Sequence, residues 1–195
     1  MPAKHLHFVG VDVGGTNVKI VAATRAGRIL HQSQFPTNDG EFTQWAHKVQ
    51  AGLAKLSRQI GEPEGIGIAA PGIVDPNARW VSWMIGRMEG IWGFDWNQYL
   101  QKPFFIPVIN DAKAALAAEV WMGAARGCDN VIMLTLGTGV GGAAMVDGKL
   151  LHGHLGRAGH LGHMSLDPSG SPDICLTPGS LENRIKSYSA WPTGR

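Results

Sequence analysis

The segment "TLGTGVGGAAMVDGKLL", residues 135–151, contains Gly137-x-Gly139-x-x-Gly142, which matches the glycine spacing of a dinucleotide-binding loop. In such a loop the glycines leave a strand and open a helix, because the helix N-terminus holds the pyrophosphate. Here the stretch "AAMVDGKLL" follows instead, and it predicts a strand, a tight turn and a further strand. The segment therefore predicts a glycine hairpin, not the cofactor loop of an oxidoreductase.

A second glycine hairpin lies near the start of the chain. Residues 5–24, "HLHFVGVDVGGTNVKIVAAT", predict a strand, a turn at Gly14-Gly15 and a second strand. After it we expect a strand at 27–37, a helix at 41–60, a buried strand near 65–70, an irregular region at 76–103, and a strand that ends at Asn110-Asp111 before an alanine-rich helix to about 125. Because strand, glycine turn and strand then recur, the chain is expected to have a duplicated α/β architecture.

Composition narrows the class of protein. With 195 residues and 44% hydrophobic residues, the chain is expected to fold as one large or two small domains. A net charge of +2 gives no indication of a nucleic-acid or membrane partner. Two cysteines form no disulfide framework, and no signal peptide or membrane span is recognisable, so we expect a cytoplasmic protein.

The paired hairpins suggest phosphate binding. Glycine lets backbone N–H groups approach an anion that a Cβ would keep away. Asp12 directly precedes the first hairpin, where a carboxylate can hold a hydrated Mg²⁺ on nucleotide phosphates. The alternative interpretation is that these are two ordinary hairpins with no role in phosphate binding. Lys19 either reaches phosphate or lies inert on a solvent face, and the tryptophans of the irregular region either pack or stack on sugar.

Five motifs, in order, resemble those of the ROK family (repressors, open reading frames, sugar kinases). They are "VGVDVGGTNVKI", "GIAAPGIVD", "PVINDAKAALAAE", "LTLGTGVGGAAMVDGKLLHG" and "GRAGHLGHMSLD". The resemblance implies a ribonuclease-H-like (actin-like ATPase) fold with two lobes and mixed sheets. It also implies an ATP-dependent kinase that transfers the γ-phosphoryl group to a hexose or amino-hexose hydroxyl. We expect lobes at 1–125 and 126–195, the second incomplete because family members continue beyond Arg195.

The same resemblance assigns roles to individual residues. Asp111 matches the family's catalytic base, although an acidic residue before a helix is also a common N-cap. The expected sugar ligands are Asn110, Gly72, His160, His163 and Glu182, and Glu182 is otherwise a charge at a helix start. Asp12 is the expected Mg²⁺ residue, and the expected phosphate-binding residues are Gly14, Gly15, Thr16, Asn17, Lys19, Gly137, Thr138 and Gly139.

The chain departs from the family pattern at two of its expected sites, the sugar site and the zinc site. His160 stands where a sugar-binding glutamate is expected, so an acceptor is replaced by a group that both donates and accepts. Many members hold a structural zinc through a histidine and three cysteines, and the matching residues here are His163, Asp173, Cys175 and Ser180. Serine is a poor Zn²⁺ ligand, so no structural zinc is expected, and His163 is expected to contact sugar or order its loop. A metal site among His152, His154, His160 and His163 is the alternative.

Two other functions compete with the kinase. ROK repressors carry a helix-turn-helix ahead of the core, and the first strand here begins too early to leave room for one. A non-catalytic sugar-binding remnant is the other alternative. The resemblance also leads us to expect a homo-oligomer.

Overall fold

The computed structural model describes residues 6–38, 43–86, 88–137 and 139–189 and divides the chain into two compact units. Unit 1 is Met1–Asp111 and unit 2 is Ala112–Arg195. This division falls earlier than the expected boundary at residue 125. The reason is that helix α3 (Asp111–Met122) packs its apolar side chains on the sheet of unit 2.

Unit 1 is built on a five-stranded mixed sheet. In spatial order its strands are β3 (Ile29–Pro36), β2 (Asn17–Ala23), β1 (Phe8–Val13), β4 (Gly65–Ala70) and β7 (Val108–Asn110). The first three are antiparallel neighbours, whereas β1, β4 and β7 run parallel. The alternation of β1 buries Val9, Val11 and Val13, which confirms the expected apolar strand.

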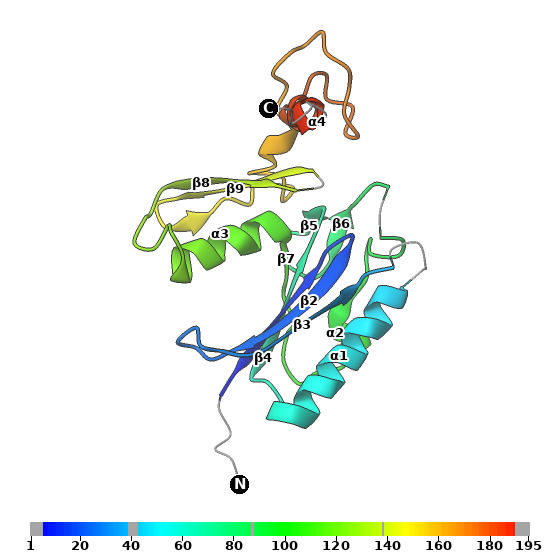
Figure 1. The fold of residues 1–195 in the computed structure, drawn as a ribbon, viewed down its shortest axis with the longest axis vertical. Coiled ribbons are helices and arrows are strands. Elements are labelled where there is room, and N and C mark those ends of the chain that lie inside the picture. The colour runs from blue at the N-terminus through cyan, green and yellow to red at the C-terminus, as the bar shows by residue number, and fades with distance from the viewer. Residues whose placement is uncertain (1–5, 39–42, 87, 138, 190–195) are drawn as a thin grey trace, which may run out of the picture. The chain divides into compact units, whose positions relative to one another are not determined.

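Helix α1 (Gln44–Ile60) covers this sheet (Figure 1). Its side chains at helical spacing, Trp45, Val49, Leu53 and Leu56, are all buried in the core of unit 1. The helix expected at 41–60 is confirmed over 44–60, and residues 41 and 42 lie outside the described part of the chain.

Short regular elements occur at 73–103, although 76–103 was expected to be irregular. Strand β5 (Ile73–Val74) pairs with β6 (Val81–Trp83), and helix α2 (Trp96–Leu100) begins after Asp95. The Asp95 carboxylate accepts hydrogen bonds from two backbone N–H groups of α2, so Asp95 is the N-cap of this short helix. Trp96 packs against Trp45 with ring centroids 5.5 Å apart, whereas Trp92 is exposed.

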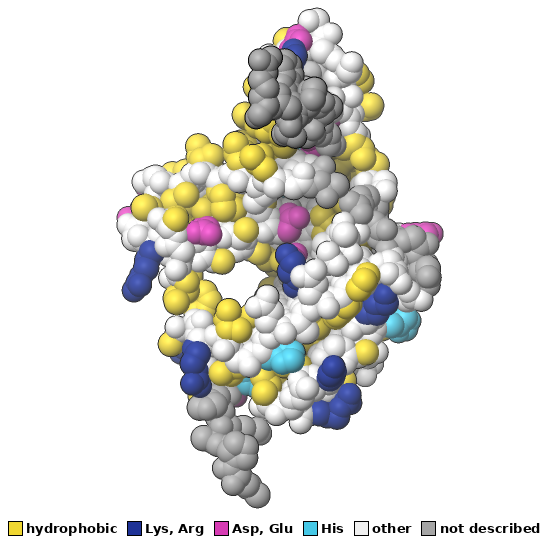
Figure 2. All heavy atoms as spheres, in the orientation of Figure 1, with side chains coloured by type: hydrophobic (Ala, Val, Ile, Leu, Met, Phe, Trp, Pro, Cys, Tyr) yellow, Lys and Arg dark blue, Asp and Glu magenta, His cyan; other side chains and the backbone are white. Residues whose placement is uncertain are grey.

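Unit 2 contains an antiparallel sheet of β8 (Val131–Leu136), β9 (Val140–Val146) and β10 (Lys149–Leu150). One face packs on α3 through Ala112, Leu116, Ala143 and Met145. The other side of β8 exposes Ile132, Leu134 and Leu136, and Figure 2 shows hydrophobic side chains over this sheet. A 3₁₀ turn, η1 (Leu161–His163), and helix α4 (Leu181–Ser189) follow. No helix in the described ranges has the length and apolar character that crossing a bilayer requires.

Candidate functional site

The parallel strands of unit 1 end at one edge of the sheet, which we call the carboxyl edge. Asp12 of β1 and Ile109 of β7 both pair with Ala69 of β4, so the three strands end in register. Ligands of open α/β sheets bind outside the carboxyl ends of such strands. The predicted site residues that lie at or just after these strand ends include Asp12, Gly14, Gly72, Asn110 and Asp111.

Asn110 links two of the other predicted site residues. Its side-chain Nδ2 donates to the Gly72 carbonyl at 3.1 Å and to Asp111 Oδ1 at 3.0 Å. Asn110 is buried at the end of β7, whereas Asp111 is exposed as the first residue of α3. The amide therefore orients a solvent-accessible carboxylate and fixes the turn that contains Gly72.

Gly72 must be glycine for steric and conformational reasons. Its φ of +89° lies in the region that L side chains rarely adopt, and a Cβ would lie 2.6 Å from the Trp83 carbonyl oxygen. The turn after β4 is therefore closed against β6, with its carbonyl left to accept from Asn110.

Asp12 and Lys19 face each other across β1 and β2. The two residues are direct partners in the ladder, and Lys19 Nζ lies 3.8 Å from Asp12 Oδ2. Burial raises the pKa of the Asp12 carboxyl, and the charge of Lys19 partly opposes that rise. Because 44% of the Asp12 side chain is exposed, the carboxylate is accessible to a hydrated cation. Lys19 thus lies beside Asp12, where it can also meet an anion.

The first glycine hairpin is held by Thr37, a residue that no sequence pattern singled out. Within the hairpin, Gly14 N donates to the Asn17 carbonyl at 3.1 Å. The Thr37 hydroxyl donates to the Gly14 carbonyl, and Thr37 N donates to the Thr16 carbonyl at 3.0 Å. Thr37 is fully buried, so these bonds fix the Gly14–Asn17 tip from the end of β3.

Replacing Thr37 with valine should loosen this tip. Valine keeps the shape of threonine but cannot donate, which leaves the Gly14 carbonyl without that hydrogen bond at a cost of about 1–3 kcal/mol. We expect lower stability in urea and faster amide exchange at Gly14–Asn17. Thr37→Ser, which keeps the hydroxyl, is the matched control and should retain slow exchange. Equal exchange in the two variants would contradict the role of the hydroxyl.

The second glycine hairpin is tied to helix α4. Gly137 N donates to the Gly139 carbonyl at 3.0 Å, and Val140 N donates to Glu182 Oε2 at 2.9 Å. A Cβ on Gly139 would lie 2.5 Å from the same Oε2, so glycine is needed for this close approach. Glu182 is buried, and its hydrogen bond with Val140 N anchors the hairpin to α4. Thr138 lies outside the described residues.

Gly142, the third glycine of the dinucleotide-like spacing, has a packing role. Strand β9, not a helix, follows the hairpin, which confirms that the glycines do not form a dinucleotide loop. A Cβ on Gly142 would lie 2.7 Å from the Gly159 carbonyl oxygen. Gly142 therefore lets the segment before η1 pack directly against the backbone of β9.

Comparison with known proteins identifies the family. A family model described as "ROK family" matches residues 8–189. The chain belongs to the ROK family. A glucokinase of Halalkalibacterium halodurans is 37% identical over 183 residues, which cover 90% of this chain and 55% of the relative. A beta-glucoside kinase of Klebsiella pneumoniae is 35% identical over 172 residues, which cover 86% of this chain and 56% of the relative.

A solved ROK structure shares the fold. The crystal structure of a ROK family glucokinase from Streptomyces griseus in complex with glucose and AMPPNP matches with a TM-score of 0.78 and 32% identity, over 91% of this chain and 56% of that one. The expected actin-like ATPase fold is thereby confirmed. The chain spans about half the length of the curated relatives it matches.

His160, the first departure from the ROK pattern, is a neutral histidine. Burial and the nearby charge of Lys113 lower the pKa of its imidazole to about 4. The Nε2 atom is buried and makes no hydrogen bond within the described part of the chain. An ionised glutamate would only accept hydrogen bonds, whereas this ring carries one donor and one acceptor.

Lys113 is a buried cation that the sequence did not reveal. It lies on α3 with 2% of its surface exposed, and its Nζ donates to the Gly156 carbonyl at 2.8 Å. Burial lowers the pKa of its amine. The lysine thus fastens the 153–159 segment of unit 2 to α3, and its charge disfavours protonation of His160.

The His160 pKa makes a prediction about acid stability. An unfolded-chain histidine titrates near 6.5, so between pH 6.5 and about 4 the unfolded state binds a proton that folded His160 does not. Stability should therefore fall as the pH drops through this window, by up to about 1.4 kcal/mol per pH unit. Urea unfolding of wild type and His160→Gln from pH 7.5 to 4.5 isolates this slope by difference. If the free energy of unfolding depends on pH in the same way in the two proteins, the lowered pKa of His160 is contradicted.

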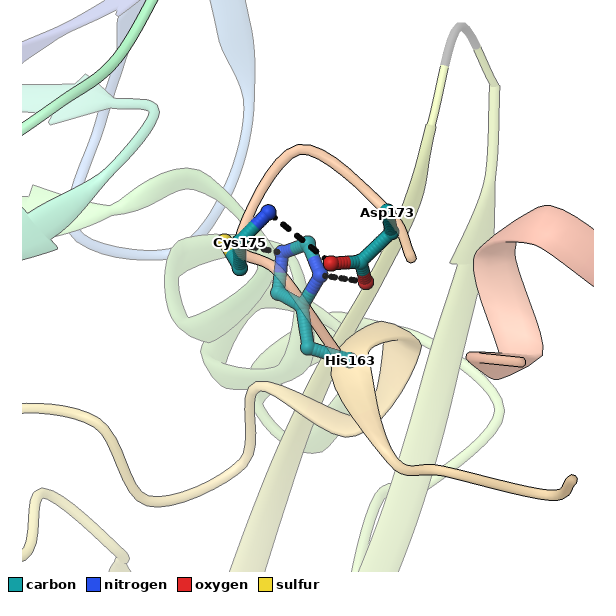
Figure 3. A group of neighbouring side chains, drawn as sticks. All are labelled: His163, Asp173 and Cys175. Carbon is teal, nitrogen blue, oxygen red and sulfur yellow. Dashed lines mark hydrogen bonds and ion pairs between the residues drawn. The ribbon is translucent and has the colours of Figure 1, made fainter. Parts of the chain in front are cut away.

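His163, which matches the zinc-binding histidine of the ROK pattern, lies between two neighbours from the following loop (Figure 3). Its Nδ1 lies 2.8 Å from Asp173 Oδ2, and its Nε2 lies 3.6 Å from Cys175 Sγ. Burial alone would raise the pKa of the Asp173 carboxyl, but hydrogen bonds from His163, Thr177, Ser180 and Cys175 hold that pKa at about 2. Among the described residues, His163, Asp173 and Cys175 are the one group close enough to share a metal, so the alternative four-histidine site is not formed.

Proposed function

We propose that this chain carries the nucleotide and sugar machinery of an ATP-dependent hexose or amino-hexose kinase, with Asp111 as the general base. The observation that carries the proposal is the Asn110 amide, which holds an exposed Asp111 carboxylate at the carboxyl edge and bonds the Gly72 turn. A carboxylate so placed can accept the proton of a sugar hydroxyl as that oxygen attacks the γ-phosphorus. The similarity to kinases of glucose and β-glucosides supports the same chemistry.

The remaining predicted residues fit the handling of phosphate. Asp12 fits a water-mediated Mg²⁺ site, and the ion would neutralise charge on the phosphates of ATP. Glycine at positions 14, 15, 137 and 139 lets phosphate approach the backbone of the two hairpins, where a Cβ would keep it away. Lys19, beside Asp12, supplies a positive charge at the first tip. In phosphoryl transfer such positioning and charge stabilisation provide most of the rate enhancement.

Asn110, His160, His163 and Glu182 are proposed to set sugar recognition. His160 brings a donor as well as an acceptor to the position of the family glutamate, so its hydroxyl preference should differ from that of glutamate-bearing relatives. For His163 and Glu182, the contacts with Asp173 and Val140 make positioning of their segments the first role.

Turnover and binding together test the proposal. ADP release is followed with Mg²⁺ and ATP over glucose, mannose, glucosamine and N-acetylmannosamine, and calorimetry measures binding of the same sugars. We expect saturable, Mg²⁺-dependent turnover with at least one of them. Sugar binding without turnover across the panel would favour a non-catalytic sugar-binding protein, and specific DNA binding in a mobility-shift assay would favour a regulator.

A further inference from the structure

The segment between η1 and α4 is a loop whose two arms lie side by side. Ser165 pairs with Ser180, and Pro172 pairs with Pro178, as isolated antiparallel bridges. The two arms approach closely, since a Cβ on Gly170 would lie 2.7 Å from the Cα of Gly179. The tip is a turn in which Asp173 N donates to the Thr177 carbonyl at 3.0 Å. This loop therefore has a defined shape that something must hold.

The carboxylate of Asp173 holds the tip through several donors. Its Oδ1 accepts from the backbone N–H groups of Cys175 at 2.8 Å and Thr177 at 3.0 Å. Its Oδ2 accepts from His163 Nδ1 at 2.8 Å, and the side chain of Ser180 also bonds the carboxylate. The Asp173 side chain is fully buried, so each of these bonds is shielded from water.

The residues at the zinc position that the ROK resemblance implies lie close enough to share a metal, but their ligand atoms are already engaged with one another. In a tetrahedral site with bonds of about 2.0–2.3 Å, one nitrogen of the histidine and the other ligand atoms converge on a single point. Here the two nitrogens of the His163 ring are directed to different neighbours, and the ring lies between Asp173 and the Cys175 thiol (Figure 3). Serine at position 180 adds a hydroxyl that already bonds Asp173.

We propose that this loop has exchanged the family's zinc for a metal-independent hydrogen-bonded cluster, centred on Asp173 and completed by His163 and Ser180. The carboxylate does what a metal does for such a loop: one buried anion joins the turn at 173–177, the η1 histidine and the residue before α4. Cys175 then contributes its backbone N–H to the cluster, and its thiol is left beside the imidazole.

Zinc content and chelator resistance test the proposal on the wild-type chain. Protein purified with zinc in the medium should contain far less than one zinc per chain by atomic emission. Its thermal midpoint should be the same with and without a chelator. Stoichiometric zinc, or a midpoint that falls when chelator is added, would overturn the proposal.

Removing the central anion tests the cluster itself. Asp173→Asn replaces the carboxylate with an amide, whose NH₂ group then faces the N–H groups that donated to it. Because several charge-assisted hydrogen bonds are lost, we expect the thermal midpoint to fall by roughly 5 °C or more. Asp147→Asn, an exposed hairpin position with φ of 50° that asparagine tolerates, is the matched control and should leave the midpoint unchanged. Equal midpoints for the two variants would contradict the role given to Asp173.

A gain of metal binding tests the correspondence of positions. The D173C/S180C variant restores three thiols and one histidine, and it should bind one zinc per chain and become sensitive to chelator. A folded double variant as poor in zinc as wild type would show that the cluster does not stand at a zinc position. If the double variant does not fold, the wild-type zinc content and the Asp173→Asn midpoint still decide the proposal.

Discussion

Asp111→Asn is expected to lower kcat for sugar phosphorylation by about 10²–10⁴-fold, the range that a positioned general base contributes. The substitution removes the base and little else. The asparagine carbonyl can still accept from Asn110 Nδ2, so the bond at 3.0 Å and the start of α3 should survive. Sugar affinity, measured by calorimetry, should therefore change little, because the lost interaction develops only in the transition state.

The control for this variant is Asp129→Asn, an exposed carboxylate before β8 and outside the proposed site. It should leave both kcat and sugar affinity unchanged. Retained turnover in Asp111→Asn would remove Asp111 from the role of base. A joint loss of turnover and sugar binding would instead make Asp111 a binding or structural residue, which its place at the start of a helix also allows.

The local parts of the fold could be predicted from the sequence. The glycine turns, the alternating strands around them and the α1 periodicity all reflect contacts between near neighbours in the chain. The short elements β5, β6 and α2 were missed because they are only two to five residues long and show no periodicity. Their burial depends on distant partners, such as Trp45 packing on Trp96.

The sequence motifs named residues that the structure brings together, but they did not reveal the residues that hold the candidate site in place. The motifs pointed to Asn110, Asp111 and Gly72, and the structure joins these three through one amide. Thr37 and Lys113 were missed for a physical reason: each acts through a bond to a backbone carbonyl far away in the sequence. A threonine after a strand and a lysine in an alanine-rich helix ordinarily face solvent, so only the tertiary fold reveals that both are buried.

Gly162→Ala is expected to have the largest effect on stability. A Cβ at this position would lie 1.8 Å from the Val140 carbonyl oxygen, far inside any real contact. The obstacle is backbone of β9, so no side-chain rotation relieves it, and η1 must move away from the strand. We expect a loss of more than about 4 kcal/mol, in the range reserved for severe core disruptions.

Gly67→Ala gives the contrast that isolates this steric cause. Gly67 lies in the middle of β4, yet an added Cβ there would meet no heavy atom within 4 Å. Alanine in a strand also loses less entropy on folding than glycine, so this variant should be as stable as wild type or slightly more so. Urea midpoints of the two variants measure the difference directly. A Gly162→Ala protein with a wild-type urea midpoint would mean that η1 does not pack against β9 as closely as the structure has it.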